Sequence, residues 1–179
     1  MPEMHGRYCE RFSILEQGSS STSVGHVSYD YRSDALLLEE AELVGIDKPK
    51  LQLMDWLLHE DQQLQVISIV GMGGLGKTTL TKKIYDDVMV KMHFQCHAWL
   101  TVSESFELDD LLKGLIKQLF EEAKKPLPRE VDTMDLNNLK SEIKAFLQEK
   151  SYVLVLDDVW DIQAWKAIAL SFPDCKCGS

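Results

Sequence analysis

A glycine-rich stretch in the first half of the chain has residue types and spacing that suit polyphosphate binding. Residues 71–79 read Gly-Met-Gly-Gly-Leu-Gly-Lys-Thr-Thr and fit the pattern G-x-x-x-x-G-K-[ST]. A loop that wraps a phosphate points successive backbone N–H groups inward, with φ values and a close approach that side chains would prevent. The expected binding residues are Gly71, Met72, Gly73, Gly74, Leu75, Gly76, Lys77, Thr78 and Thr79. The alternative is a glycine-rich turn that binds nothing.

The residues after the last glycine have separate expected roles. A helix that starts near Lys77 would add its N-terminal amides and the positive end of its dipole to the site. Lys77 is expected to reach the β- and γ-phosphates and to act in catalysis, and the Thr78 hydroxyl to ligate Mg²⁺. Thr79 is placed either to cap the helix or to touch the α-phosphate.

Two adjacent aspartates form the second candidate group. Asp157 and Asp158 follow an apolar run, residues 152–156, at the place where a metal-binding carboxylate ends a strand in phosphate-loop proteins. Asp157 is expected to hold Mg²⁺, directly or through water, opposite Thr78. Asp158 could position or activate the attacking water as a general base. The alternative is that one or both carboxylates cap the helix expected to begin near Asp161.

Strand and helix patterns alternate around these two groups. Short β-branched runs predict buried parallel strands at residues 66–70, 98–102 and 152–156. Apolar residues at helical spacing predict helices from 77 to about 90, over 108–120 and over 136–147. This alternation indicates an α/β fold with a parallel sheet and right-handed crossovers.

The chain's length and composition suit a single globular domain with a less ordered start. It has 179 residues, of which 45% are hydrophobic and 27% charged. Residues 1–40 have little apolar periodicity and contain a serine-rich run at 19–23, so they are predicted to be a flexible leader or linker. Order is expected to begin near residue 41, with Asp47 as a helix N-cap and Pro49 in the first turn.

Charge and cysteine usage exclude several classes of protein. The 29 acidic and 19 basic residues give a net charge of −10, which opposes docking on nucleic acid or an anionic membrane. No stretch is apolar enough for a membrane span or anchor, and the N-terminus has no secretory pattern. The four cysteines, Cys9, Cys96, Cys175 and Cys177, are expected to be free thiols in a reducing cytoplasm. His93 and His97 are expected to be packed or solvated rather than metal ligands.

Four blocks in this order and spacing resemble the nucleotide-binding (NB-ARC) module of plant coiled-coil-type disease-resistance proteins with leucine-rich repeats. The blocks are residues 43–47, 71–79, 98–103 and 154–160. The resemblance implies an incomplete three-layer fold like that of P-loop NTPases, covering 41–179. It also implies an ATP/ADP switch, closed with ADP and opened by ATP exchange, that acts with other immune-receptor domains or proteins in defence. It places adenine contacts at Val44 and Gly45, phosphate contacts at Gly73 to Thr79, and Mg²⁺ contacts at Thr78 and Asp157.

The family's sequence goes on to features that these 179 residues do not contain. They include a strand with an arginine that senses the γ-phosphate, helical and winged-helix subdomains, and the repeats, and the family also has a coiled-coil domain before this segment. The resemblance therefore implies a truncated switch module with weak nucleotide affinity and at most slow ATP hydrolysis. Without the next strand, the strands at 66–70 and 152–156 are expected to have unpaired edges that invite aggregation.

Two other function classes stay open from the sequence. A small P-loop phosphotransferase would use the same loop, but it normally needs a lid with several arginines, and only Arg129 follows the loop here. A non-catalytic interaction fragment or decoy would keep the surface and lose nucleotide turnover. Nucleotide binding, with or without turnover, separates the switch module and the phosphotransferase from the interaction fragment.

Overall fold

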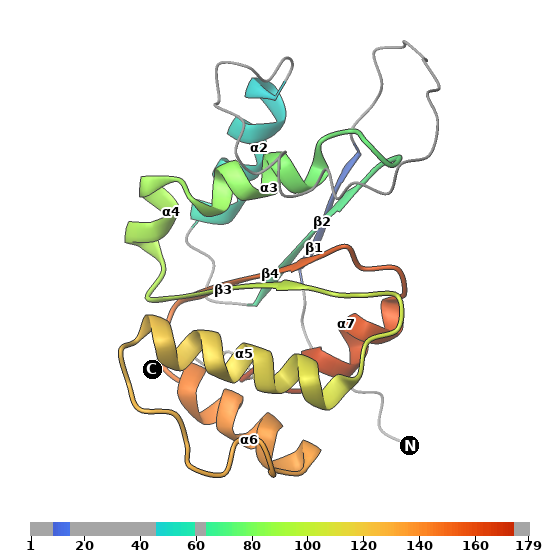
Figure 1. Ribbon diagram of the computed structural model, residues 1–179. Helices are drawn as coiled ribbons and strands as arrows, with labels where there is room; N and C mark the ends of the chain where they lie inside the picture. Colours follow the sequence, from blue (N-terminus) through green and yellow to red (C-terminus); the bar gives the residue numbers. More distant parts are fainter. Residues whose placement is uncertain (1–8, 15–45, 60–63, 174–179) are drawn as a thin grey trace. The chain divides into compact units, whose positions relative to one another are not determined.

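The computed structural model describes residues 9–14, 46–59 and 64–173. The chain divides into two compact units, residues 1–90 and 91–179, and each is described by itself. Helices and strands alternate through most of the described chain (Figure 1). The predicted α/β fold with parallel strands is confirmed.

The first unit contains a parallel strand pair, and helices lie before and after the glycine-rich stretch in sequence. Strand β1 (Cys9–Ile14) pairs in parallel with β2 (Gln65–Val70), from Cys9 opposite Gln65 to Ile14 opposite Val70. Helix α2 (Asp47–Leu58) contacts α3 (Lys77–Tyr85), and the Lys50 Nζ and Asp87 Oδ2 atoms lie 3.5 Å apart. The loop after β2 leads directly into α3 (Figure 1).

Three predictions about the strands and helices of this unit are wrong. Strand β1 lies in the stretch predicted to be a leader or linker, and no strand was expected there. The helix from Lys77 ends at Tyr85, and a separate α4 (Val88–His93) follows, because the Asp87 carboxylate accepts from the Met89 N–H at 3.0 Å and starts it. Asp47 is the first residue of α2 and not its N-cap, which is Ile46 without a side-chain cap.

The second unit is a parallel strand pair covered by helices. Strand β3 (Cys96–Thr101) pairs with β4 (Tyr152–Asp157) from Cys96 opposite Tyr152 to Thr101 opposite Asp157. Helix α5 (Leu108–Glu122) packs against β3, and α6 (Leu136–Leu147) lies beside α5 (Figure 1). Helix α7 (Ile162–Ala169) also contacts α5. The helices are connectors long enough for parallel pairing, as a βαβ crossover requires.

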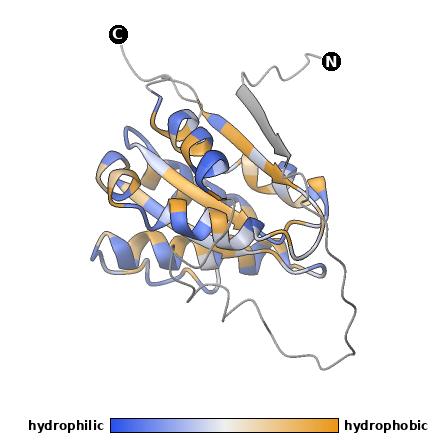
Figure 2. Cartoon of the chain, turned by 90° about the horizontal axis from the view of Figure 1, so that it is seen from above, coloured by the Kyte–Doolittle hydropathy of each residue, from blue (hydrophilic) through white to orange (hydrophobic). Residues whose placement is uncertain are grey.

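The helices of the second unit follow the predicted apolar spacing. Colouring by hydropathy shows apolar and polar residues alternating along the helices, as expected where one face is buried (Figure 2). Side chains that are essentially inaccessible to solvent come from α5, α6 and α7: Leu112, Leu115, Ile116, Leu119, Leu139, Ile143, Leu147 and Ile168. The carboxylate of Asp135 caps α6 by accepting from the Asn138 N–H at 2.9 Å. These contacts join the helices of the second unit to one another and, through α5, to β3.

Candidate functional site

The glycine-rich loop has the backbone conformation that its sequence predicts. Gly74 and Gly76 have φ angles of 78° and 77°, in the left-handed region that favours glycine. A Cβ added at either residue would meet nothing within 4 Å, so conformation and not crowding accounts for glycine at these two positions. Gly73 has neither a positive φ nor a crowded Cβ position, so the fold of the loop does not explain why this residue is glycine.

Helix α3 begins at the end of this loop without a side-chain cap. Gly76 is its N-cap residue, and the first helical bond runs from the Leu80 N–H to the Gly76 carbonyl at 2.8 Å. Helix N-termini present backbone N–H groups and the positive end of the dipole. Thr79 is buried, 6% exposed, in the first turn and does not cap the helix, so that alternative is wrong. Thr78 is half-buried beside it.

The Lys77 side chain folds back over the start of the loop. Its ammonium donates to the carbonyl of Gly71 at 2.9 Å and to that of Met72 at 2.8 Å. The phosphate-loop pattern predicts phosphate contacts for Lys77 but not these two carbonyl partners, because no sequence pattern indicates a backbone acceptor. An ammonium has three N–H donors, so the two contacts leave capacity for an anion. They also fix the position of the positive charge at the loop.

The two aspartates form a turn at the end of β4. Asp157 is the last strand residue, and its carbonyl accepts from the Val102 N–H at 2.8 Å. Asp158 has a φ of 60°, which is uncommon for a residue with a side chain and costs conformational energy. Both residues are half-buried. Asp161 caps α7 by accepting from the Gln163 N–H at 3.0 Å, so the cap is neither Asp157 nor Asp158.

Sequence comparison places these two groups of residues in a known family. Residues 46–179 match the NB-ARC domain model, which is most of the chain. This chain belongs to the NB-ARC domain family.

Several plant proteins are similar to this NB-ARC chain. Disease resistance protein RPM1 of Arabidopsis thaliana is 39% identical over 145 residues, which cover 81% of this chain and 16% of that protein. ToMV resistance protein Tm-2(2) of Solanum lycopersicum is 36% identical over 177 residues, which cover 97% of this chain and 19% of that protein. Disease resistance protein RGA2 of Solanum bulbocastanum is 38% identical over 139 residues, which cover 75% of this chain and 14% of that protein. The chain therefore spans less than a fifth of each of these relatives.

The structure brings some of the candidate residues of this NB-ARC chain together. Residues 71–79 form one loop and helix start in the first unit, and Asp157 and Asp158 form one turn in the second. Val44 and Gly45 lie outside the described residues, so the adenine contacts stay a prediction. The roles of the candidate site residues also stay predictions, because the structure gives their positions and not their ligands.

Of the histidines and cysteines considered above, His93, His97 and Cys96 are described in the second unit, whereas Cys175 and Cys177 lie outside the described residues and the side chain of Cys9 is not described. His97 is buried, 6% exposed, with its Nδ1 atom 2.7 Å from the Glu122 Oε1 atom, and the His93 ring packs edge-on against Phe94. His97 is therefore packed in the interior, whereas His93 is exposed and contacts its neighbour's ring in this way. Cys96 is a buried free thiol whose pKa is raised chiefly by burial. Among the described residues, no group of three or more His, Cys, Asp or Glu side chains could hold a metal ion.

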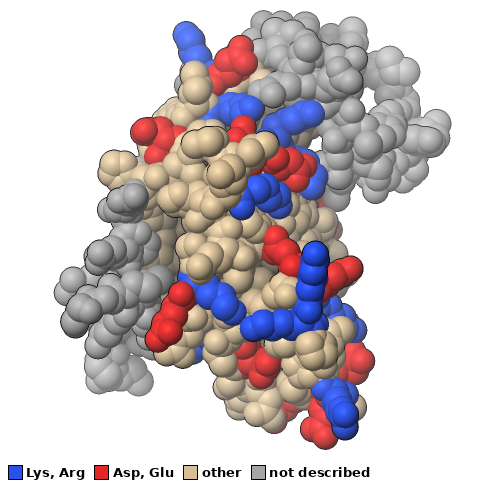
Figure 3. All heavy atoms as spheres, turned by 90° about the vertical axis from the view of Figure 1, so that its left-hand side faces the viewer, with Lys and Arg blue, Asp and Glu red and all other residues tan. Residues whose placement is uncertain are grey.

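Two observations bear on whether this chain binds membranes or nucleic acid. No helix in the described part of the chain is long and apolar enough to cross a membrane. On the face drawn in Figure 3, basic and acidic side chains of the described residues are interspersed, without a broad basic area on that face. The exclusion of nucleic acid as a partner stays a prediction from the net charge of −10.

Proposed function

We propose that residues 71–79 bind the phosphates of ADP or ATP, and that this chain is the nucleotide-binding module of a plant immune receptor. The observation that supports this most directly is the loop itself. Two left-handed glycines, Gly74 and Gly76, lead into the uncapped start of α3, and the Lys77 ammonium lies over the loop carbonyls. Such an arrangement of backbone N–H groups, helix dipole and one cation is an anion site.

Gly73 adds an independent argument for a ligand. Its backbone and surroundings would accept a side chain, since its φ is not positive and a Cβ would meet nothing within 4 Å. A phosphate that approaches the backbone closely is a reason for glycine that does not depend on the loop's own packing. The open space at Gly73 therefore supports a phosphate contact at this residue.

The proposed metal is Mg²⁺ bound with the nucleotide. Thr78 offers a half-buried hydroxyl and Asp157 a half-buried carboxylate, and Mg²⁺ prefers oxygen ligands of these kinds. Bound with the nucleotide, Mg²⁺ would neutralise phosphate charge. Asp158, which follows Asp157 directly, is the proposed general base toward a water molecule. We expect hydrolysis to be slow or absent, and Val44 and Gly45 to contact the adenine.

The role in immunity is proposed from the relatives. Their names describe resistance proteins, but ToMV susceptible protein tm-2 of Solanum lycopersicum is 35% identical to this chain, against 36% for ToMV resistance protein Tm-2(2). The similarity therefore does not separate resistant from susceptible forms, and recognition of a pathogen is better sought outside this segment. We infer a cytoplasmic module that acts with other receptor domains or proteins.

The test is nucleotide affinity in a matched pair of variants of the 179-residue chain. Lys77→Ala removes the cation at the loop, and Lys82→Ala removes the same charge from the same helix, where Lys82 makes a surface ion pair with Asp86 at 3.2 Å. Removing one member of a desolvated charge pair costs about 2 to 5 kcal/mol, so Lys77→Ala should weaken ADP binding at least roughly thirtyfold. Isothermal titration calorimetry measures both affinities.

The control variant should bind ADP like the parent chain, since exposed ion pairs contribute little. A folded Lys77→Ala variant with unchanged affinity would refute the site. A parent chain that is folded but binds neither ADP nor ATP would favour the non-catalytic interaction fragment instead.

A further inference from the structure

Strand β3 has two edges, and only one of them pairs with β4. In a parallel pair, alternate residues direct their backbone N–H and C=O groups toward the partner strand. The Cys96 N–H donates to the Ser151 carbonyl at 3.1 Å and the Val102 N–H to the Asp157 carbonyl at 2.8 Å, so the even-numbered residues face β4. The backbone groups of His97 and Trp99 therefore belong to the other edge.

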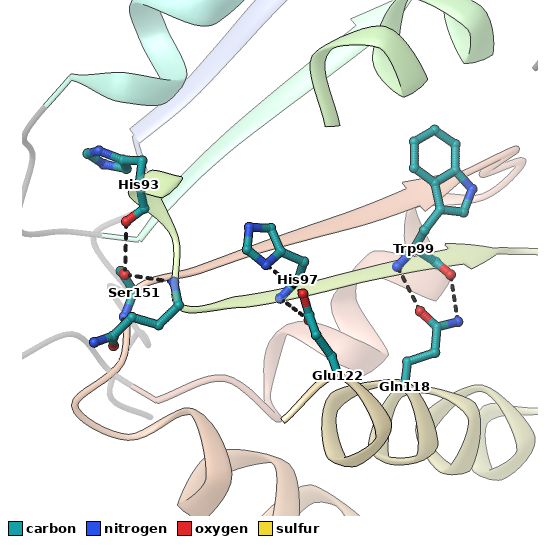
Figure 4. Close-up of polar contacts among 7 residues, drawn as sticks. His93, His97, Trp99, Gln118, Glu122 and Ser151 are labelled. Carbon is teal, nitrogen blue, oxygen red and sulfur yellow. Dashed lines mark hydrogen bonds and ion pairs between the residues drawn. The ribbon is translucent and has the colours of Figure 1, made fainter. Parts of the chain in front are cut away.

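Two side chains of α5 occupy that other edge (Figure 4). The Gln118 carboxamide accepts from the Trp99 N–H at 2.9 Å and donates to the Trp99 carbonyl at 2.7 Å. The Glu122 carboxylate accepts from the His97 N–H at 2.7 Å, and its other oxygen lies 2.7 Å from His97 Nδ1. Gln118 thus supplies the donor and acceptor that a peptide group of a neighbouring strand would supply.

The geometry of the two elements allows both contacts at once. His97 and Trp99 are two residues apart, which is about 6.6 Å along a strand. Gln118 and Glu122 are four residues apart, which is about 6 Å along a helix and places them on the same face. Because α5 runs back along β3, Glu122 meets His97 and Gln118 meets Trp99. The two contacts form one repeated arrangement along the edge.

We propose that Gln118 and Glu122 are an edge guard, which stops β3 from pairing with β3 of a second copy of this chain. The strand reads Cys-His-Ala-Trp-Leu-Thr, with no Asp, Glu, Lys or Arg and no proline, and four of its six residues are buried. Such a strand with an open edge is a template for self-pairing, and every copy offers an identical edge. Among the residues that the structure describes, β3 pairs with β4 alone, and the guard covers its other edge. This inference does not depend on the proposed nucleotide site.

The direct test removes both side chains from the full 179-residue chain. Gln118→Ala with Glu122→Ala opens the edge while keeping good helix formers in α5. The matched control, Glu121→Ala with Gln148→Ala, removes the same residue types at exposed positions. Sedimentation velocity over a range of protein concentrations measures the mass. As concentration increases, the guard variant should exceed the mass of the parent by up to one further chain of 20.4 kDa, and the control should follow the parent.

A third substitution separates edge pairing from association through another surface. Thr101 is an exposed β3 residue, and lysine on an edge strand opposes strand addition. Adding Thr101→Lys to the guard variant should return it to the mass of the parent. Association that Thr101→Lys does not reduce would overturn the proposal, as would a guard variant whose mass stays that of the parent at all concentrations.

The milder Gln118→Glu variant keeps the test decisive if the double variant does not fold. A carboxylate cannot donate to the Trp99 carbonyl, and repulsion between the carboxylate and this carbonyl oxygen should also weaken the bond that the carboxylate accepts from the Trp99 N–H. Amide hydrogen exchange of Trp99 should then accelerate at least roughly tenfold, the factor expected for a weakened hydrogen bond, while Ala98 on the β4 side keeps its rate. Equal acceleration at Ala98 and Trp99 would show loss of general packing and would contradict the guard.

Discussion

The glycine-rich loop and the aspartate turn both contain left-handed residues, but of different kinds. In the loop these residues are Gly74 and Gly76, which adopt φ angles near 77° without steric cost. In the turn the left-handed residue is Asp158, with a φ of 60° and a side chain that makes this conformation costly. The glycines therefore allow the loop to adopt its conformation without strain, whereas the turn retains an aspartate in a conformation that costs free energy.

The two regions also differ in what supports them. Lys77 holds the loop through carbonyls five and six residues earlier in the chain. The turn depends on the pairing of β4 with β3, in which Asp157 lies opposite Thr101 and accepts from Val102. A local sequence motif can therefore define the loop, but the position of the aspartates requires contacts between distant segments. Costly backbone conformations are retained most often where the side chain has a function.

The largest effect expected in the turn concerns the separate roles of its two aspartates. If Asp157 holds the metal, Asp157→Ala should weaken Mg²⁺-dependent ADP binding by roughly tenfold or more, because contacts to charged groups contribute about 1.5–3 kcal/mol. Asp158→Ala should leave this affinity unchanged and reduce any hydrolysis. Magnesium titration and a phosphate-release assay measure the two properties. Equal loss of affinity in both variants would show that the roles are not divided in this way.

A second prediction concerns a substitution that introduces backbone strain into the loop. Gly76→Ala places a Cβ on a residue with a φ of 77°, which should lower the free energy of unfolding by about 1–2 kcal/mol. The surrounding space would accept the methyl group, so the loss would come from conformation alone. Urea denaturation measures it. Unchanged stability would mean that the loop adopts another conformation in solution.

Substitution of a glycine outside both regions should have the opposite effect and increase stability. Gly114 lies within α5, its φ is not positive, and an added Cβ would lie 3.7 Å from the Leu100 Cδ2 atom, an ordinary contact distance. Gly114→Ala should therefore raise the free energy of unfolding by about 0.4–1 kcal/mol, since alanine favours the helix and restricts the unfolded chain. The same denaturation experiment checks it, and a loss of stability would contradict the packing between α5 and β3.

The smallest expected effect tests how much free energy the left-handed conformation of Asp158 costs. Asp158→Gly relieves the left-handed conformation but makes the unfolded chain more flexible, so a net gain of only about 0.5 kcal/mol is expected. Thermal unfolding without nucleotide detects the change. A loss of more than about 1 kcal/mol would show instead that contacts of the Asp158 side chain outweigh the conformational cost.

Particular residues show which parts of this protein its sequence predicts. The phosphate-loop pattern and the apolar spacing of α5 and α6 correctly indicated the loop start of α3 and the buried helix faces, because both follow from local conformational preference. The break at Asp86 and Asp87 was missed, since apolar spacing continues through Val88 while the Asp87 carboxylate starts a new helix at Met89. The strand at Cys9–Ile14 was missed because its pairing with β2 joins segments more than fifty residues apart.

The sequence by itself determined the family, the loop residues and the alternation of strands and helices. These follow from motifs, from glycine's conformational freedom and from periodic burial, which act over a few neighbouring residues. Only the tertiary structure decided that Lys77 bonds to the Gly71 and Met72 carbonyls and that Gln118 and Glu122 close the edge of β3. The β3 contacts join residues 19 and 25 positions apart. Their acceptors and donors are largely backbone groups, which every residue type offers and which therefore leave no signature in the sequence.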